Sequence, residues 1–91
     1  MESTEQTISR LLNLYGDMIL RLSFSYLKNM QDAEDVVQEV FIKFMDYTPN
    51  FNDSGHEKAW FMKTSVNLCK NKLKSYGRKH TSFFEEEAQI P

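Results

Sequence analysis

Apolar residues recur every three or four positions in three stretches of the chain, which is the pattern of amphipathic helices. The first stretch runs from Ile8 to about Lys28. Its expected core positions are Leu11, Leu12, Tyr15, Met18, Ile19, Leu22 and Tyr26. Asn29 is expected to end this helix, because asparagine tolerates the left-handed conformation found at many helix C-termini. Residues 1–7 are polar and are expected to fray.

The second predicted helix runs from about Gln31 to Tyr47, and Asp32 is expected to cap its first amide groups. One side of this helix carries the expected core residues Ala33, Val36, Val37, Val40, Phe41 and Phe44. The other side carries Asp35, Gln38, Glu39, Ile42 and Asp46. That side is either a solvated acidic face or a small contact patch for a basic, partly apolar partner. The helix dipole explains acids in the first turn but does not explain Glu39 or Ile42.

A polar loop from Thr48 to Gly55 follows, and the simplest interpretation of its Phe51 is a plug that seals the core. Ser54 and Glu57 have the spacing of a capping box, which predicts a third helix to about Tyr76. The expected core stripe of this helix is Met62, Val66, Cys69, Leu73 and Tyr76.

The opposite side of the third helix is basic and amide-rich. It carries Lys63, Asn67, Lys70, Asn71 and Lys74, with Trp60 and Thr64 on its flank and Arg78 beyond Gly77. Lysines neutralise phosphates, asparagine amides can bond to base edges, and an aromatic ring can stack on an unpaired base. A solvated basic face is the alternative. Asparagine is a poor helix former, however, and two of them on one exposed face favour a nucleic-acid partner.

The composition agrees with one small all-α domain. The chain has 91 residues, with three glycines and two prolines. Its single cysteine, Cys69, cannot form an internal disulfide, and no segment has the pattern of a signal peptide or a membrane span, so we expect a cytoplasmic protein. The net charge is only −2, yet from Lys58 to His80 there are seven lysines or arginines and no acid. This asymmetry favours a polyanionic partner.

Residues typical of catalysis or cofactor binding are not arranged in recognisable motifs. The sequence contains no phosphate loop, no HExxH, no paired-cysteine motif and no nucleophile elbow, and His56 and His80 have no nearby ligand to complete a metal site. A magnesium site built from Asp32, Asp35 and Glu39 is the one metal hypothesis, and capping or a partner surface explains these acids better. We therefore expect no cofactor and no enzymatic activity.

Two segments carry a resemblance to a known family. The motif DAEDVVQEVFIKFM, a short loop bearing an aromatic residue, and then AWFMKTSVNLCKNKLKSYGRK resemble the promoter-binding domain, region 2, of bacterial sigma factors of the extracytoplasmic-function (ECF) type. The likeness covers about Ile8 to Lys79. It implies an all-α, three-helix bundle of the sigma region 2 type over residues 8–79, between a flexible N-terminus (1–7) and a linker or tail (80–91).

The resemblance also implies partners. In this family the second helix docks on the clamp helices of the RNA polymerase β′ subunit, and the matching positions are Asp35, Gln38, Glu39, Ile42 and Met45. The third helix and the preceding loop read the −10 element on the non-template strand. The matching positions are Phe51, Asn52, Lys63, Asn67, Lys70, Asn71, Lys74 and Arg78, while Trp60 supports the loop from beneath. An anti-sigma factor is a further expected partner.

The sequence departs from the family pattern at four positions, Met62, Thr64, Ser65 and Asn71, so its base preference is open. A second domain that reads the −35 element is also not present in the sequence. The expected function is therefore a transcription-initiation module that binds polymerase and helps to melt the −10 element. A clamp-binding decoy without DNA reading, and a small metal-dependent nuclease that uses the acids of the second helix, are the alternatives.

Overall fold

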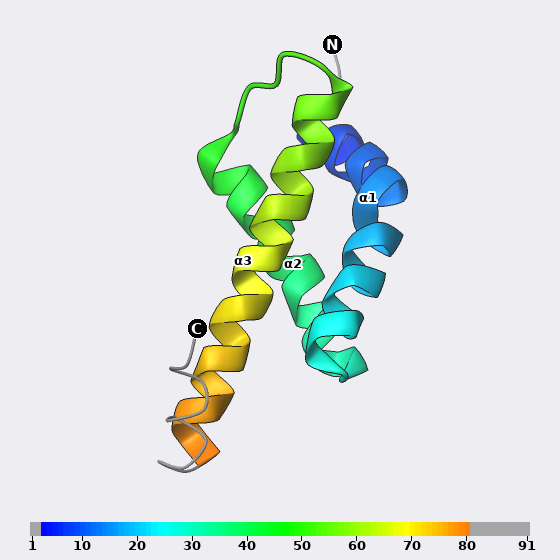
Figure 1. The fold of residues 1–91 in the computed structure, drawn as a ribbon. Coiled ribbons are helices and arrows are strands. Elements are labelled where there is room, and N and C mark those ends of the chain that lie inside the picture. Colours follow the sequence, from blue (N-terminus) through cyan, green and yellow to red (C-terminus); the bar gives the residue numbers. More distant parts are fainter. Residues whose placement is uncertain (1–2, 81–91) are drawn as a thin grey trace.

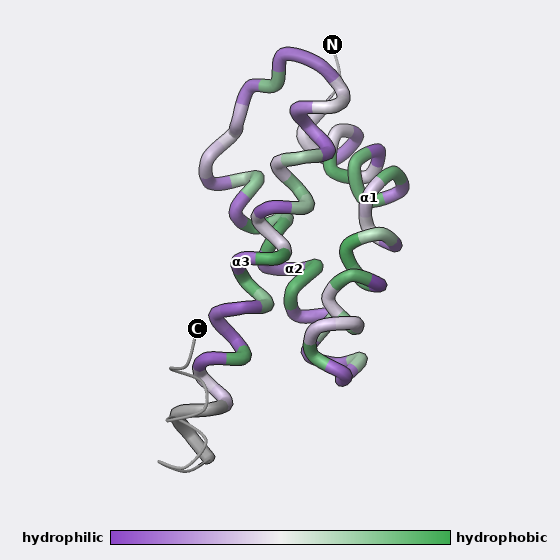
Figure 2. Tube along the Cα trace, in the orientation of Figure 1, coloured by the Kyte–Doolittle hydropathy of each residue, from purple (hydrophilic) through white to green (hydrophobic). Residues whose placement is uncertain are grey.

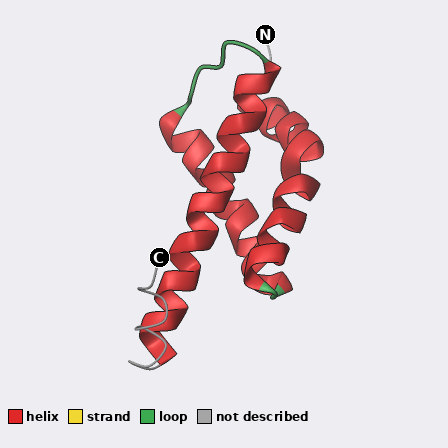
Figure 3. Ribbon diagram, viewed as in Figure 1, coloured by secondary structure: helices red, strands yellow, loops and turns green. Residues whose placement is uncertain are grey.

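The structure, a computed structural model, describes residues 3–80, with side chains described to Tyr76. It has three helices, α1 (Thr4–Leu27), α2 (Met30–Tyr47) and α3 (Ser54–His80), and no strand in the part described (Figures 1 and 3). The helices α1 and α2 form a hairpin. The longer α3 packs across both of them, and its C-terminal turns project beyond the pair (Figure 1). The expected all-α, three-helix bundle is confirmed.

The first helix begins earlier than the apolar pattern predicts. The Ser3 hydroxyl accepts a hydrogen bond from the Gln6 backbone N–H, and the Gln6 side chain accepts one from the Ser3 N–H. This reciprocal capping box satisfies two amide groups that otherwise lack a partner. The predicted start of this helix at Ile8 is therefore wrong, because the cap at Ser3 and not the first apolar residue decides where the helix starts.

The turn between α1 and α2 uses different caps from those expected. Lys28, not Asn29, adopts the left-handed conformation that ends α1, with φ 57°. Asn29 is extended and caps α2, because its side chain accepts the Asp32 N–H at 2.9 Å. The predictions for Asn29 and for Asp32 as a cap are both wrong. With so short a turn, the asparagine serves the start of α2, and the Asp32 carboxylate is left free for another partner.

The start of α3 is displaced by one residue from the predicted capping box. Asp53 is the capping residue, since its carboxylate accepts the His56 N–H at 2.8 Å and its carbonyl accepts the Glu57 N–H at 3.1 Å. Glu57 instead accepts a hydrogen bond from the Tyr15 hydroxyl at 2.7 Å, which connects α3 to α1. At its other end the helix continues past Tyr76 to His80. The remainder of the expected tail, 81–91, lies outside the described residues.

The core is built from all three helices around one aromatic cluster. Its buried apolar residues are Leu11, Tyr15, Ile19, Leu27, Ala33, Val36, Val40, Phe41, Phe61 and Cys69. The expected α2 stripe is confirmed, with Val37 and Phe44 half-buried at its edges. Leu12 is an exception on α1, because 46% of its surface is exposed.

The buried stripe of α3 differs from the predicted one. Met62 and Leu73 are 39% and 40% exposed, whereas Phe61 and Ser65 are fully buried. The predicted stripe is therefore right at Cys69, which is fully buried, and wrong at Met62 and Leu73, so the buried side of α3 is turned by less than one residue from the predicted orientation. Phe61 explains the difference, because its ring lies 4.9 Å from that of Tyr15 and 5.4 Å from that of Phe41.

Ser65 can accompany Phe61 into the core because its hydroxyl donates to the carbonyl of Phe61 at 2.6 Å. This local bond satisfies the hydroxyl without a partner from another helix. The result is a helix whose buried stripe contains a serine that a hydropathy pattern does not count. Figure 2 shows that α3 is mostly hydrophilic in the turns just before its grey C-terminal end.

Candidate functional site

The outer side of α2 presents an acidic surface with apolar residues among the acids, called here the α2 face. It consists of the predicted residues Asp35, Gln38, Glu39, Ile42 and Met45. Ile42 and Met45 are 50% and 47% exposed, so both apolar side chains face solvent, as the periodicity predicts for Ile42. Glu39 is half-buried, and its carboxylate lies 3.8 Å from Lys72 Nζ of α3. The structure therefore brings these five residues together on one helix.

An apolar groove between α1 and α2 borders the α2 face. Two neighbouring hollows, of about 630 and 360 Å³, share Leu12, Val37 and Gln38 in their walls. The first is also lined by Gly16, Asp17, Leu20 and Glu34, and the second by Ile8, Phe41 and Ile42. Periodicity places Leu12 in the core, since it cannot distinguish the edge of an apolar stripe from its centre. Leu12 instead extends the apolar surface beside Ile42.

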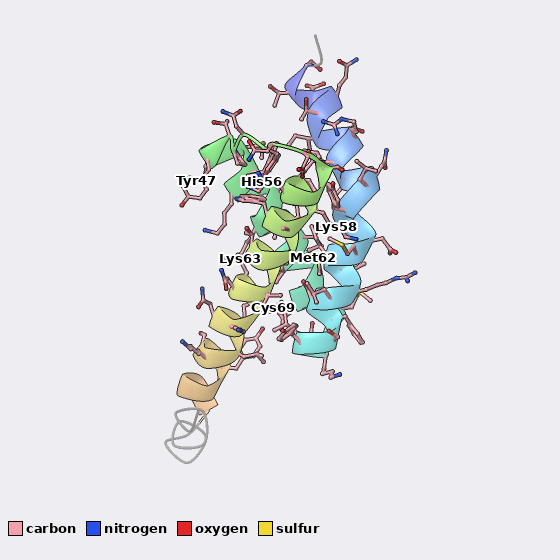
Figure 4. The ribbon with its side chains drawn as sticks, turned by 45° about the horizontal axis from the view of Figure 1, so that its top comes forward. Tyr47, His56, Lys58, Met62, Lys63 and Cys69 are labelled. Carbon is pink, nitrogen blue, oxygen red and sulfur yellow. The ribbon has the colours of Figure 1, made fainter. Side chains whose placement is uncertain are left out.

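The basic side of α3, called here the α3 face, is exposed as predicted. Its residues are Lys63, Asn67, Lys70, Asn71 and Lys74. Figure 4 shows Lys63 on the side of α3 that faces away from α1. Lys72 is not part of this face, because it is partly buried beside Glu39. Arg78 lies in the helix, but its side chain is outside the described set.

Phe51 lies over the aromatic cluster. Its ring is stacked 6.5 Å from that of Phe44, and it meets Trp60 nearly edge-on at 6.1 Å. It is half-buried, which agrees with the interpretation of Phe51 as a plug. The contact with Trp60 agrees with the expectation that this tryptophan supports the loop from beneath. Asn52, the next residue, is exposed.

His56 is a contact of this loop that the sequence did not assign. Its Nδ1 atom accepts a hydrogen bond from the Asn52 backbone N–H at 3.2 Å. Its ring stands edge-on to Phe51 with 5.4 Å between centroids. The signal that could have found it is the pair Asp53 and His56, which has capping-box spacing with histidine in the place of Glu or Gln.

At the opposite end of α3, Tyr76 donates a hydrogen bond to the Asp32 carboxylate and so connects α3 to α2. This bond raises the pKa of Tyr76 to about 12, and burial and the charges of Asp32 and Asp35 act in the same direction. Burial is also the first cause that raises the pKa of Tyr15, followed by its bond to Glu57.

Cys69 is fully buried and lies near Ser23 and Lys72. Burial raises the pKa of its thiol, although Ser23 and Lys72 act in the opposite direction. The buried Ser23 hydroxyl has no hydrogen-bond partner that meets geometric criteria among the described residues. Cys69 is therefore a core residue with the protonated, poorly reactive thiol expected of one.

The hypothetical magnesium site is not assembled. Within residues 3–80 no three His, Cys, Asp or Glu side chains are grouped so that they could hold a metal ion. The Asp32 carboxylate is bonded to Tyr76, and Glu39 lies beside Lys72. None of the described helices has the length and apolarity needed to cross a membrane.

This arrangement of an acidic helix, an aromatic-bearing loop and a basic helix agrees with the family match. The family described as Sigma-70 region 2 matches residues 11–79, which include most of α1 and nearly all of α3. The chain belongs to the sigma-70 region 2 family. The resemblance drawn from the two sequence motifs is thereby confirmed.

Two curated sigma factors are similar to this region 2 domain. The RNA polymerase sigma-H factor of Pseudomonas aeruginosa (strain PAO1) is 34% identical over 65 residues, which cover 71% of this chain and 34% of the relative. The ECF RNA polymerase sigma factor SigW of Bacillus subtilis (strain 168) is 24% identical over 70 residues, covering 77% of this chain and 37% of the relative. The chain thus spans about a third of the length of these relatives. No solved structure matches it significantly.

Proposed function

We propose that this sigma region 2 domain acts in transcription initiation as part of an ECF-type sigma factor, binding RNA polymerase through the α2 face and a promoter strand through the α3 face. The observation that carries the proposal is the separation of two exposed surfaces of opposite charge on one sigma region 2 fold. Both named relatives are RNA polymerase sigma factors, which supports the same function.

On the polymerase side, the α2 face offers carboxylates around exposed apolar side chains. The partner that fits is a helical surface with basic residues flanking apolar ones, and we assign it to the β′ clamp helices. The exposure of Ile42 and Met45 supports this assignment, because large apolar side chains ringed by acids gain more from a partner than from solvent. An anti-sigma factor would compete for such a surface.

On the DNA side, the α3 face combines amides that can bond to base edges with lysines that can neutralise phosphates. Asn67 and Asn71 are proposed to contact bases of the −10 element, and Lys63, Lys70, Lys74 and Arg78 its backbone. Phe51 and Asn52 are proposed to form the pocket for an extruded base of the non-template strand. Extrusion costs a few kcal/mol, which contacts in such a pocket would offset and so help melting.

The test is binding of the 91-residue chain to single-stranded DNA at two salt concentrations. A strand enriched by the chain from a random pool serves as the probe, and a scrambled strand of the same composition is the control. We expect a preference that persists at the higher salt, since base contacts depend on salt less than phosphate contacts do. Equal binding to both strands, lost in salt, would remove sequence reading from the proposal.

The inward packing of Phe51 favours a second candidate, a module that occupies the polymerase clamp without reading DNA. One set of substitutions has different expected effects under the two candidate functions. Charge reversal at Lys63, Lys70 and Lys74 abolishes strand binding if α3 contacts DNA, and it has no effect on a clamp-binding decoy. Asp35→Arg is the matched control, because it should weaken binding to a β′ clamp fragment in both cases.

A further inference from the structure

His56 joins the loop before α3 to the first turn of that helix. Its Nδ1 atom accepts the Asn52 N–H, while its own backbone N–H donates to the Asp53 carboxylate. Its ring stands at 89° to that of Phe51. Figure 4 shows His56 at the loop end of α3, with Lys63 further along the same helix. One side chain therefore touches both loop residues that were assigned to the base pocket.

The contacts of Phe51 and of Asn52 differ in kind. The Phe51 ring is seated by Phe44 and Trp60 through apolar contacts, which are non-directional. The bond from the Asn52 N–H to His56 is directional, and it fixes the Phe51–Asn52 peptide and so the direction in which the exposed Asn52 side chain leaves the loop. His56 is itself exposed, so its side chain is not needed to fill the core.

We propose that His56 is a positioning residue that holds Phe51 and Asn52 in the base-reading conformation, and that protonation of its ring releases the loop. This inference rests on the proposed function, because it concerns the same DNA surface. It adds a residue outside the set assigned from the sequence. It also adds a dependence of strand preference on pH.

The protonation step follows from the chemistry of imidazole. Neutral histidine can accept at Nδ1, whereas the protonated ring carries hydrogen on both nitrogens and presents a donor to the Asn52 N–H. Two acids lie near it in the chain. Asp53 accepts the His56 backbone N–H, and Glu57 is bonded to Tyr15 from α1. The loop bond is therefore lost when the ring is protonated, because Nδ1 is then no longer an acceptor.

The first arm of the test follows the loop without DNA. The temperature coefficient of the Asn52 amide proton, measured by NMR on the 91-residue chain, reports whether this amide is hydrogen-bonded. We expect a bonded amide in the wild type at about pH 8, loss of the bond at about pH 5, and loss at both pH values in His56→Ala. His56→Asn keeps a side-chain oxygen acceptor without a titrating group, and it should keep the bond at both. His80→Asn, which removes the other histidine, should behave as the wild type.

The second arm measures the preference for the strand enriched from a random pool over its scrambled control. In the wild type this preference should fall by about two- to tenfold between about pH 8 and pH 5, the loss of one hydrogen bond. His56→Ala should show the lower preference at both pH values and His56→Asn the higher. Total affinity is not the readout, because a charged His56 would strengthen attraction to phosphates on any strand.

The outcomes distinguish a failure of the proposed function from a failure of the proposed role of His56. A wild-type chain that enriches no strand overturns the proposed function and the base-reading role of His56 with it. A wild-type preference that His56→Ala leaves unchanged at both pH values overturns this inference and leaves the proposed function standing. If His56→Ala does not fold, as judged by circular dichroism, the wild-type pH profile against His56→Asn decides the same question.

Discussion

The two ends of α3 are held by different physical means. At the loop end, Phe61 is fully buried among the rings of Tyr15, Phe41 and Phe44, and the Tyr15–Glu57 hydrogen bond is added to that apolar contact. At the far end, Leu73 is exposed, and the polar pairs Tyr76 with Asp32 and Lys72 with Glu39 connect α3 to α2, with the Tyr76 ring half-buried against the core. Apolar burial therefore anchors one end, and hydrogen bonds and charges attach the other.

This difference matters because the proposed DNA surface spans both ends. The loop, Trp60 and Lys63 belong to the apolar end, whereas Lys70 and Lys74 lie over the polar end. Burial of apolar surface depends little on pH, while polar contacts are lost when one partner changes its charge. We therefore expect the core packing of Phe61 to resist changes in pH and the attachment of the far end to respond to them, while the His56 bond within the loop is a separate, polar contact.

The largest expected effect is that of removing the anchor at the apolar end. Phe61→Ala should lower the free energy of unfolding by about 3–5 kcal/mol, because it deletes a buried ring and leaves a cavity. Urea denaturation followed by circular dichroism measures this loss. Small domains are stabilised by only about 5–15 kcal/mol, so Phe61→Ala removes a large part of the total stability. Phe61→Leu is therefore the milder second variant.

Met62→Ala is the matched control, because Met62 adjoins Phe61 and is the residue that the predicted stripe places in the core. It is 39% exposed, so its truncation should cost about 1 kcal/mol or less. Equal losses for the two substitutions would contradict the observed orientation of α3 and restore the stripe predicted from the sequence.

The next effect in size concerns Tyr76. Tyr76→Phe should lower the free energy of unfolding by about 1 kcal/mol at neutral pH, the usual contribution of one hydrogen bond. The folded pKa of about 12 exceeds the ordinary tyrosine value of about 10. This contribution is therefore complete below about pH 10 and is lost as pH rises towards 12. Denaturation midpoints of wild type and variant should converge over that range.

The control for Tyr76 is Tyr47→Phe, since Tyr47 is 68% exposed at the end of α2. It should leave the midpoint unchanged at neutral pH. If Tyr76→Phe and wild type show no gap at neutral pH, the ring packing of Tyr76, which phenylalanine keeps, and not its hydroxyl attaches this end of α3.

These two ends also show what the sequence can and cannot predict. Periodicity identified all three helices and the buried side of α2, because Val36, Val40 and Phe41 face the core in any three-helix packing. It misplaced the stripe of α3, where Met62 and Leu73 compete with Phe61 for the core. Hydropathy cannot decide that competition, which depends on ring contacts with residues of other helices.

The predictions of the capping residues failed for a related reason. Asn29, Asp32, Asp53 and Ser54 are all capping types, and the pattern offers no rule for choosing between neighbours. The exposed site residues were predictable, because lysines, asparagines and acids on one helix face remain exposed whichever way the bundle is packed. His56 was not, since its role depends on where the loop backbone passes.

The smallest expected effect is that of the ion pair between Glu39 and Lys72. The pair is partly exposed and 3.8 Å long, so Glu39→Gln should lower the free energy of unfolding by about 0.5 kcal/mol or less, and by still less in high salt. Asp17→Asn is the control, because the ion pair of Asp17 is with Arg21 of the same helix, at 3.0 Å, and joins no two helices.

This small effect makes Glu39 a sharp probe of the α2 face. Because Glu39→Gln hardly changes folding, any large loss of binding to a β′ clamp fragment must come from the missing carboxylate itself and not from a displaced α3. Truncation of a charge in a desolvated contact costs about 2 kcal/mol or more, well above the stability change. If Glu39→Gln lowers the free energy of clamp binding by no more than it lowers the free energy of unfolding, Glu39 serves the attachment of α3 and lies outside the interface.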